Sequence, residues 1–256
     1  MTRILLVAAV AAAAVASFAI FFDGSSAIAA EIKLIGSPGV RGAVSELSGQ
    51  FEKTTGHRVV TDFAVIAVLK RRIDAGETFD VVIPGPELID DLIAQGKVAA
   101  DSRTAFARTG LGVGVRKGTP KPDISTVENL KRALLSAQVV AHSKEGQSGV
   151  NFLEILDRLG IAQDMRPKLR TYDGNGMAVA MQNGEVDIAV SGMGPILELQ
   201  GADVVGGIPP ELQRYVRFAA GVSTTAKEPE AARALLQFLT SPTAAPVFKV
   251  KGLERD

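Results

Sequence analysis

The sequence predicts an α/β fold of two lobes, with a ligand cleft between the lobes and two crossings of the chain from one lobe to the other. Strand-like and helix-like segments alternate over most of the chain, and glycines close several of the helices. Such alternation is typical of a largely parallel sheet with helices packed on it. Two long extended segments, at 109–115 and 215–222, flank the middle of the chain and mark the crossings. The helices after 222 are therefore expected to return to the first lobe.

In the first part of the chain, short apolar runs alternate with segments whose apolar residues recur every three or four positions, which indicates strands and amphipathic helices. Gly56, Gly76 and Gly96 end the helices. The predicted strands lie at 32–35, 59–63 and 79–83, and the helices begin near 40, 66 and 87.

The later part of the chain repeats the same alternation. Ser125 and Glu128 have the spacing of a capping box that would open a helix at Val127. We expect a first lobe of residues 31–107 plus 218–256 and a second lobe of residues 108–217. The remaining predicted elements are strands at 139–142, 186–190 and 215–222, and helices at 127–137, 152–159, 177–183, 229–239, 242–249 and near 196.

Residues 1–30 are predicted to be a cleavable signal peptide. Arg3 provides the positive charge, residues 4–22 are almost all apolar, and small alanines up to Ala30 precede the cleavage point. A permanent membrane anchor is the alternative, because an apolar run of 19 residues could just cross a bilayer. The chain has no cysteine that could carry a lipid. We therefore expect a monomer that diffuses freely in the periplasm of a Gram-negative bacterium, with no membrane anchor after cleavage.

The composition excludes several classes of function. The 28 lysines and arginines balance 28 acidic residues, and removal of the signal peptide takes one charge of each sign, Arg3 and Asp23. This neutral total argues against binding of nucleic acid or anionic membranes. Without cysteine there can be no disulfide or thiolate nucleophile, and two histidines alone make a zinc site improbable. We predict neither a metal nor a cofactor.

Several motifs, taken in order, resemble one family of binding proteins. They are Val40-Arg41-Gly42 with 50–57, then 72–77 with 79–83, and near the C-terminus 219–223 and 239–242. Together they resemble the type II periplasmic solute-binding proteins, in the ModA-like branch named for its molybdate binders, over essentially the whole mature chain. The resemblance implies the two-lobed type II periplasmic binding protein fold, a small anionic ligand in the cleft, and an ABC transporter permease as partner.

The resemblance also implies that four loops meet at the cleft: 36–41, 64–67, 147–149 and 173–176. Each loop would point a helix N-terminus at the ligand, where unpaired N–H groups and the helix dipole favour an anion. Ser148 has a second interpretation as the N-cap of its helix. The predicted ligand-binding residues are Ser37, Pro38, Gly39, Arg41, Ile66, Ala67, Ser148, Gly149, Asn175, Gly176 and Ser191.

The predicted ligand loops depart from the pattern of the molybdate binders. Those proteins use hydroxyl side chains in the first two loops and a tyrosine in the second lobe, whereas here the loop 64–68 has no hydroxyl and the tyrosine position falls near Ser191. The apolar side chains and Arg41 favour an organic anion, whose carboxylate a guanidinium can grip with two hydrogen bonds. An ordinary exposed arginine is the alternative for Arg41. Binding of molybdate or tungstate is kept as a further hypothesis.

The same branch includes aconitate isomerase, so an exported enzyme that interconverts trans- and cis-aconitate is the alternative to transport. Such an enzyme needs cationic groups for three carboxylates and a side chain that moves an allylic proton. Arg41 is the candidate clamp, and His142 or Glu145 the candidate proton carrier. His142 ends a predicted buried strand, where parallel sheets present functional groups. A buried, hydrogen-bonded structural histidine is the alternative there.

Overall fold

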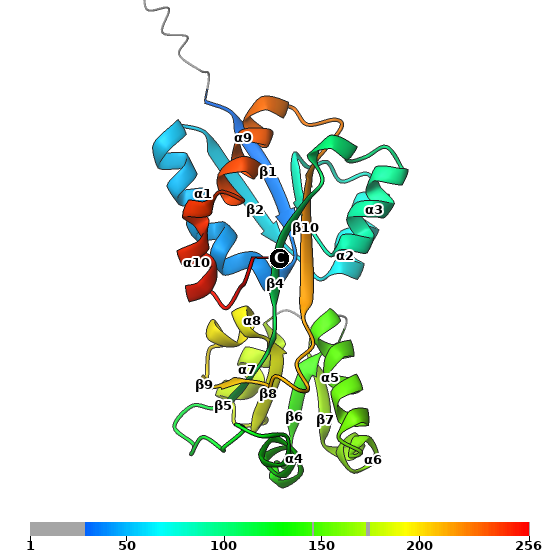
Figure 1. Ribbon diagram of the computed structural model, residues 1–256, viewed down its shortest axis with the longest axis vertical. Coiled ribbons are helices and arrows are strands. Elements are labelled where there is room, and N and C mark those ends of the chain that lie inside the picture. Colours follow the sequence, from blue (N-terminus) through cyan, green and yellow to red (C-terminus); the bar gives the residue numbers. More distant parts are fainter. Residues whose placement is uncertain (1–28, 145, 173–174, 256) are drawn as a thin grey trace, which may run out of the picture.

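The computed structural model describes residues 29–144, 146–172 and 175–255, and these form two lobes, each built on a five-stranded sheet (Figure 1). The order of strands in the first sheet is β2-β1-β3-β10-β4, and in the second β7-β6-β8-β5-β9. The first sheet comprises β1 (Glu31–Gly36), β2 (Arg58–Phe63), β3 (Val81–Ile83), β4 (Thr104–Thr109) and β10 (Val216–Val222). The second comprises β5 (Leu111–Arg116), β6 (Val140–Ser143), β7 (Leu169–Tyr172), β8 (Ile188–Gly192) and β9 (Ala202–Gly207).

Both sheets are mixed rather than fully parallel. In the first, β1 pairs in parallel with β2 and β3, while β10 runs antiparallel to β3 and β4. In the second, β6 pairs in parallel with β7 and β8, while β5 runs antiparallel to β8 and β9. The antiparallel strands β4, β5 and β10 are those beside the crossings between the lobes. The predicted α/β fold is confirmed, with this addition of antiparallel strands.

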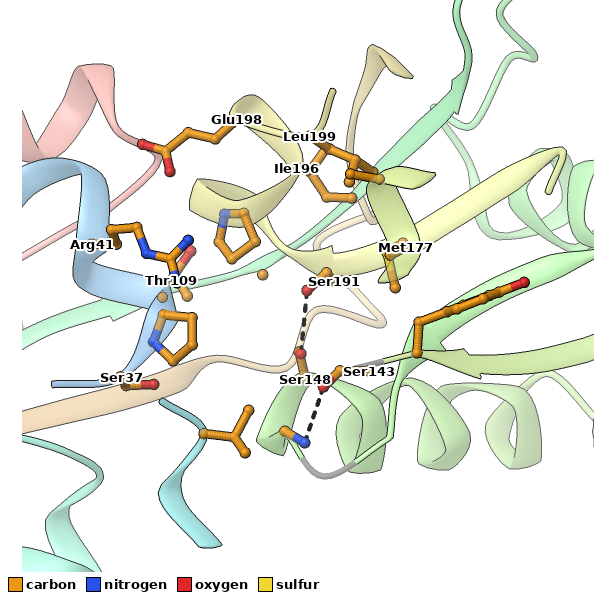
Figure 2. A pocket seen from close by; sticks show the side chains of 18 of the residues that line it. Ser37, Arg41, Thr109, Ser143, Ser148, Met177, Ser191, Ile196, Glu198 and Leu199 are labelled. Atoms are coloured by element: carbon orange, nitrogen blue, oxygen red, sulfur yellow. Dashed lines mark hydrogen bonds between the residues drawn. The ribbon is translucent and has the colours of Figure 1, made fainter. Parts of the chain in front are cut away.

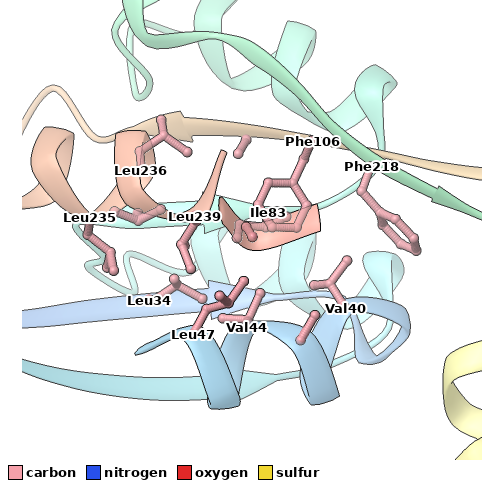
Figure 3. Packing of buried hydrophobic residues seen from close by; sticks show 14 of the residues in the cluster. Leu34, Val40, Val44, Leu47, Ile83, Phe106, Phe218, Leu235, Leu236 and Leu239 are labelled. Carbon is pink, nitrogen blue, oxygen red and sulfur yellow. The ribbon is translucent and has the colours of Figure 1, made fainter. Parts of the chain in front are cut away.

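Helices cover both faces of the first sheet (Figure 1). Side chains alternate along a strand, so Leu34 packs into the core beneath α1 and α9, while its neighbour Ile35 packs into the core beneath α2 and α3. Figure 3 shows Leu34 and Ile83 of this sheet facing Leu47 of α1 and Leu235 of α9. The C-terminal helices do return to the first lobe. The helices here are α1 (Arg41–Thr55), α2 (Ile66–Asp74), α3 (Pro86–Ala94), α9 (Pro229–Leu239) and α10 (Ala245–Val250), with short turns η1 (Pro38–Val40), η2 (Ala100–Ser102) and η4 (Pro242–Ala244).

The second lobe has its own core, in which Phe152 of α5 and Leu134 of α4 pack against the strands β5 and β8. Met177 and Met181 of α7 fill the opposite face of the sheet together with Ile196 of α8. The helices of this lobe are α4 (Val127–Ser136), α5 (Gln147–Arg158), α6 (Ala162–Met165), α7 (Gly176–Gln182) and α8 (Met193–Leu197), with the turn η3 (Arg166–Lys168).

The chain passes between the lobes at Gly110, which separates β4 from β5, and again just before β10. Residues 108–109 and 216–217 therefore belong to strands of the first sheet, although the predicted boundary placed them in the second lobe. The carbonyl of Gly110 accepts a hydrogen bond from the Met193 N–H at 2.9 Å, and the Thr109 hydroxyl donates to the Gly252 carbonyl at 2.8 Å. These bonds fix the crossing against α8 on one side and the C-terminal segment on the other.

Some local predictions were wrong. The helix α4 is capped by Thr126, whose hydroxyl accepts from the Asn129 N–H at 3.2 Å, so the capping box from Ser125 to Glu128 does not form. The helix α5 begins at Gln147, within a segment predicted to be a loop. The short strands β4, β7 and β9 were not predicted.

Among residues 29–255 as described, none of the helices is long and apolar enough to span a bilayer. The predicted signal peptide lies almost entirely within residues 1–28, outside the described part of the chain, so it stays a prediction.

Candidate functional site

A cavity of about 470 Å³ opens between the two lobes, lined by residues of both (Figure 2). Its volume is in the range of small-molecule sites and many times the roughly 30 Å³ that one water occupies in the liquid, so it can hold an organic molecule of several carbon atoms. The walls combine apolar side chains with hydroxyl groups. The apolar lining includes Pro38, Val65, Ile66, Met177, Val179, Ile196, Leu199, Val216 and Phe218.

Three helices of eight or more residues begin at the cavity. Arg41 starts α1, Ile66 starts α2 and Gln147 starts α5, and all three residues line the cavity. None of these helices has a side-chain cap from the described residues, in contrast to α4, which Thr126 caps away from the cavity. The first N–H groups of a helix need a partner from outside the helix. The Arg41 N–H already donates to the Pro38 carbonyl of the preceding turn η1, so the cavity collects its backbone donors from the starts of α2 and α5. The positive helix ends favour an anion.

Hydroxyl groups project into the cavity from both lobes (Figure 2). The Ser148 and Ser191 oxygens lie 3.5 Å apart, at the edge of hydrogen-bond distance. Within the described part of the chain, the Ser37 hydroxyl has no hydrogen-bond partner although the residue is buried. The Ser143 hydroxyl instead accepts from the Gly146 N–H at 3.0 Å and closes the loop before α5. Ser37, Ser148 and Ser191 therefore offer serine hydroxyls to a ligand.

Arg41 brings a positive charge to the cavity at the start of α1. Its guanidinium carbon lies 5.6 Å from the centre of the Phe63 ring, an arrangement that orients the side chain through a cation–π contact. The side chain is exposed, and in the described ranges no carboxylate pairs with it. A cation at a helix N-terminus is unfavourable by itself, so a bound anion would stabilise it.

The structure brings most of the predicted ligand-binding residues together. Those that line the cavity are Ser37, Pro38, Gly39, Arg41, Ile66, Ser148, Asn175 and Ser191. The others lie nearby: Ala67 points to solvent from α2, and Gly176 lies against the Tyr172 ring. Ser148 is the second residue of α5 and not its N-cap, which is Gly146.

Gly149 lies where α5 packs against the end of β6, outside the cavity. A methyl group at this position would collide with the Ser143 carbonyl oxygen and lie 3.2 Å from His142 Nδ1. The glycine therefore serves the close approach of α5 to the end of β6, and it does not line the cavity.

His142 is buried and does not line the cavity either. Its Nδ1 lies 3.0 Å from the Ser143 carbonyl oxygen, which can only accept, so Nδ1 carries the proton. The ring packs against Phe152 with 5.8 Å between ring centres. Burial lowers the pKa of His142, and the hydrogen bond to the Ser143 carbonyl opposes this only in part. This environment is that of a structural histidine. Glu145 lies outside the described residues.

Sequence reasoning missed several residues of the cavity. Tyr172 and Glu198 are titratable side chains of the second lobe that line it, and Thr109 lines it at the crossing. The crossing itself was a usable signal for Thr109, because a chain that passes between lobes also passes the cleft. Nothing local marks Tyr172 or Glu198. Within the described ranges, no group of three or more histidine and acidic side chains is close enough to hold a metal ion.

Comparison with known proteins identifies the family. The sequence pattern of the family described as bacterial extracellular solute-binding protein matches residues 32–254. The chain belongs to the bacterial extracellular solute-binding proteins. Among curated relatives, this solute-binding protein is 32% identical to an aconitate isomerase from Pseudomonas sp over 231 residues, 87% of each chain. It is 26% identical to the molybdate-binding protein ModA of Azotobacter vinelandii over 235 residues, 89% of this chain and 91% of that protein.

The fold of this solute-binding protein also matches solved structures. The Azotobacter vinelandii periplasmic molybdate-binding protein superposes with a TM-score of 0.74 at 20% identity, over 88% of this chain and 99% of that one. The substrate binding domain of a putative molybdenum ABC transporter from Clostridium difficile gives a TM-score of 0.69 at 15% identity, over 89% and 100% of the two chains. The predicted membership in the ModA-like branch, which includes aconitate isomerase, is confirmed.

Proposed function

We propose that this solute-binding protein captures a small organic carboxylate between its lobes and delivers it to an ABC importer. The observation that carries the proposal is the Arg41 guanidinium, with which no carboxylate of the described residues pairs. It lies beside three helix N-termini that lack a side-chain cap from those residues, in a largely apolar cavity. A guanidinium matches the two oxygens of a carboxylate, and the apolar walls match a carbon skeleton. The family supplies the binding components of ABC importers, which supports a permease as partner.

Two features favour an organic anion over molybdate or tungstate. The cavity of about 470 Å³ is far larger than one tetrahedral oxyanion needs. The start of α2 offers its N-cap residue Val65 and its first residue Ile66 to the cavity, and no hydroxyl side chain. A tetrahedral oxyanion gains its selectivity from many short hydrogen bonds, which the apolar part of this wall does not supply.

The second candidate is an isomerase of the aconitate type, and the 32% identity to the Pseudomonas sp aconitate isomerase is the observation that favours it. Incubation of the purified protein with trans-aconitate, followed by separation of the two isomers, distinguishes the two functions. Turnover above a heat-inactivated control would replace transport with catalysis. Binding without turnover supports the role in transport.

The proposal is tested by isothermal titration calorimetry with organic carboxylates, molybdate and tungstate against the parent protein and Arg41→Ala. The parent should bind a carboxylate, and loss of a charge-assisted contact of about 1.5–3 kcal/mol should weaken that binding by about 10- to 150-fold in Arg41→Ala. Arg58→Ala is the matched control, because Arg58 pairs with Glu31 on the surface of the first lobe and does not line the cavity. Equal affinity of the parent and Arg41→Ala for every carboxylate would exclude Arg41 from the site.

We further propose that the protein is exported through the signal peptide of residues 1–30 and works free in the periplasm, as the family of binding proteins does. Cell fractionation tests this: the processed protein should leave the cell on osmotic shock, whereas a permanently anchored protein would remain in the membrane pellet.

A further inference from the structure

The charges that line the cavity are few and opposed. Among its described lining residues, Arg41 is the only cationic side chain and Glu198 the only acidic one, so their formal charges cancel. The remaining positive potential comes from the uncapped N-termini of α1, α2 and α5. Each is equivalent to about half an elementary charge, or about one and a half charges in all.

Glu198 reaches from the second lobe to the helix end that holds Arg41. It directly follows α8, and a methyl group at Gly42, in the first turn of α1, would collide with its carboxylate oxygen Oε1. Figure 2 shows the Glu198 and Arg41 side chains on the same side of the cavity. Glu198 is exposed, and within the described ranges neither a hydrogen bond nor an ion pair neutralises its carboxylate. Its negative charge therefore acts on whatever anion binds at the start of α1.

From this arrangement we infer that Glu198 determines how many charges the ligand carries: the cavity accepts a mono- or dicarboxylate and rejects a third carboxylate. The inference rests on the proposed function, binding of an organic carboxylate, and adds the ligand class. A potential of about one and a half positive charges balances one or two carboxylates. A third carboxylate near α1 meets Glu198 as a like charge, and repulsion of this kind is an effective source of specificity. Without Glu198, the same cavity would have about two and a half positive charges and would tolerate three carboxylates.

Calorimetric titration with three acids on a similar carbon chain tests the inference: butanoate, pentanedioate and propane-1,2,3-tricarboxylate. In the parent, the tricarboxylate should bind most weakly. Glu198→Gln should tighten the tricarboxylate by about tenfold, as expected for removing one like charge about 6 Å away at an effective dielectric constant of about 40. Butanoate should change by less than about threefold, because its single carboxylate can bind at the N-termini of α2 and α5, away from Glu198.

Glu128→Gln is the matched control, since Glu128 is an exposed residue of α4 that does not line the cavity. It should leave all three affinities unchanged and so separate a local effect from one of net charge. Tightest binding of the tricarboxylate by the parent, or an unchanged affinity of Glu198→Gln for the tricarboxylate, would overturn the inference while leaving the proposed function standing. If no variant binds any of the three acids but molybdate binds, the proposed function fails and the inference falls with it.

Discussion

Gly149 provides a sharp test of how the cavity wall is held. It is the third residue of α5, and its Cα faces the end of β6, where a methyl group would overlap the Ser143 carbonyl oxygen. That carbonyl cannot easily turn away, because it also accepts the hydrogen bond from His142 Nδ1 at 3.0 Å. The Ser143 hydroxyl holds the Gly146 N–H at 3.0 Å in the same loop. The substitution Gly149→Ala should therefore push α5 away from β6.

Two opposing effects set the magnitude. Alanine favours a helix over glycine by up to about 1 kcal/mol, whereas forcing an extra methyl group into a packed contact costs about 1–3 kcal/mol. The collision here is with backbone, so we take the upper part of that range and expect a net loss of about 1–2 kcal/mol in the free energy of unfolding. For a chain of this size the loss corresponds to a decrease in Tm of about 3–6 °C.

Urea denaturation and thermal unfolding of Gly149→Ala and Gly49→Ala form the assay. Gly49 lies within α1, and a methyl group there would meet no atom within 4 Å. Gly49→Ala should therefore gain about 0.5–1 kcal/mol from helix propensity alone. Because Ser148 lies beside Gly149, the destabilised variant should also bind the ligand more weakly. A Gly149→Ala protein as stable as Gly49→Ala would refute the close contact of α5 with β6.

Two further predictions concern pH. The Glu77 carboxylate accepts from Arg72 Nε at 2.5 Å and from Lys33 Nζ at 3.0 Å, and these bonds, the Arg72 bond above all, lower its pKa from 4.5 to about 2. Because the carboxyl pKa is lowered in the folded state, its ion pairs stabilise the fold above pH 4.5, and this stabilisation is lost as the pH falls toward 2. Glu77→Gln should therefore lower the free energy of unfolding at pH 7 by about 1–2 kcal/mol, after allowance for solvent screening, and make that free energy depend less on pH in acid. Equal pH profiles of the variant and the parent in urea titrations would contradict this. Burial lowers the pKa of His142, so the unfolded chain binds a proton at a higher pH than the folded one, and stability should fall as the pH drops below the ordinary histidine range. In His142→Asn the decrease in the free energy of unfolding between pH 7 and pH 5 should be smaller than in the parent, although the variant is less stable at pH 7. An equal decrease in the variant and the parent, measured by urea titration, would be evidence against the buried neutral imidazole.

Most of the first lobe could be predicted from the sequence, since its elements follow local periodicities. The alternation of Leu34 and Ile35 between two cores is fixed by the two-residue repeat of a strand, and Gly56 ends α1 with the left-handed backbone that glycine adopts. The strand β9 escaped prediction because its residues are only half-buried and pair along the edge of the sheet, so no apolar pattern marks them.

The sequence by itself determined the two-lobed α/β fold, the family and the loops that face the cleft. These depend on the spacing of apolar residues and on motifs within short stretches of chain. The tertiary structure alone decided which side chains of those loops reach the cavity. It placed Gly149 behind the wall and His142 in the core, and it brought Glu198 of the second lobe to the first turn of α1. Residues more than 150 positions apart in the chain meet there, as Gly42 and Glu198 do. No local pattern encodes a distance that only the packing of two lobes creates.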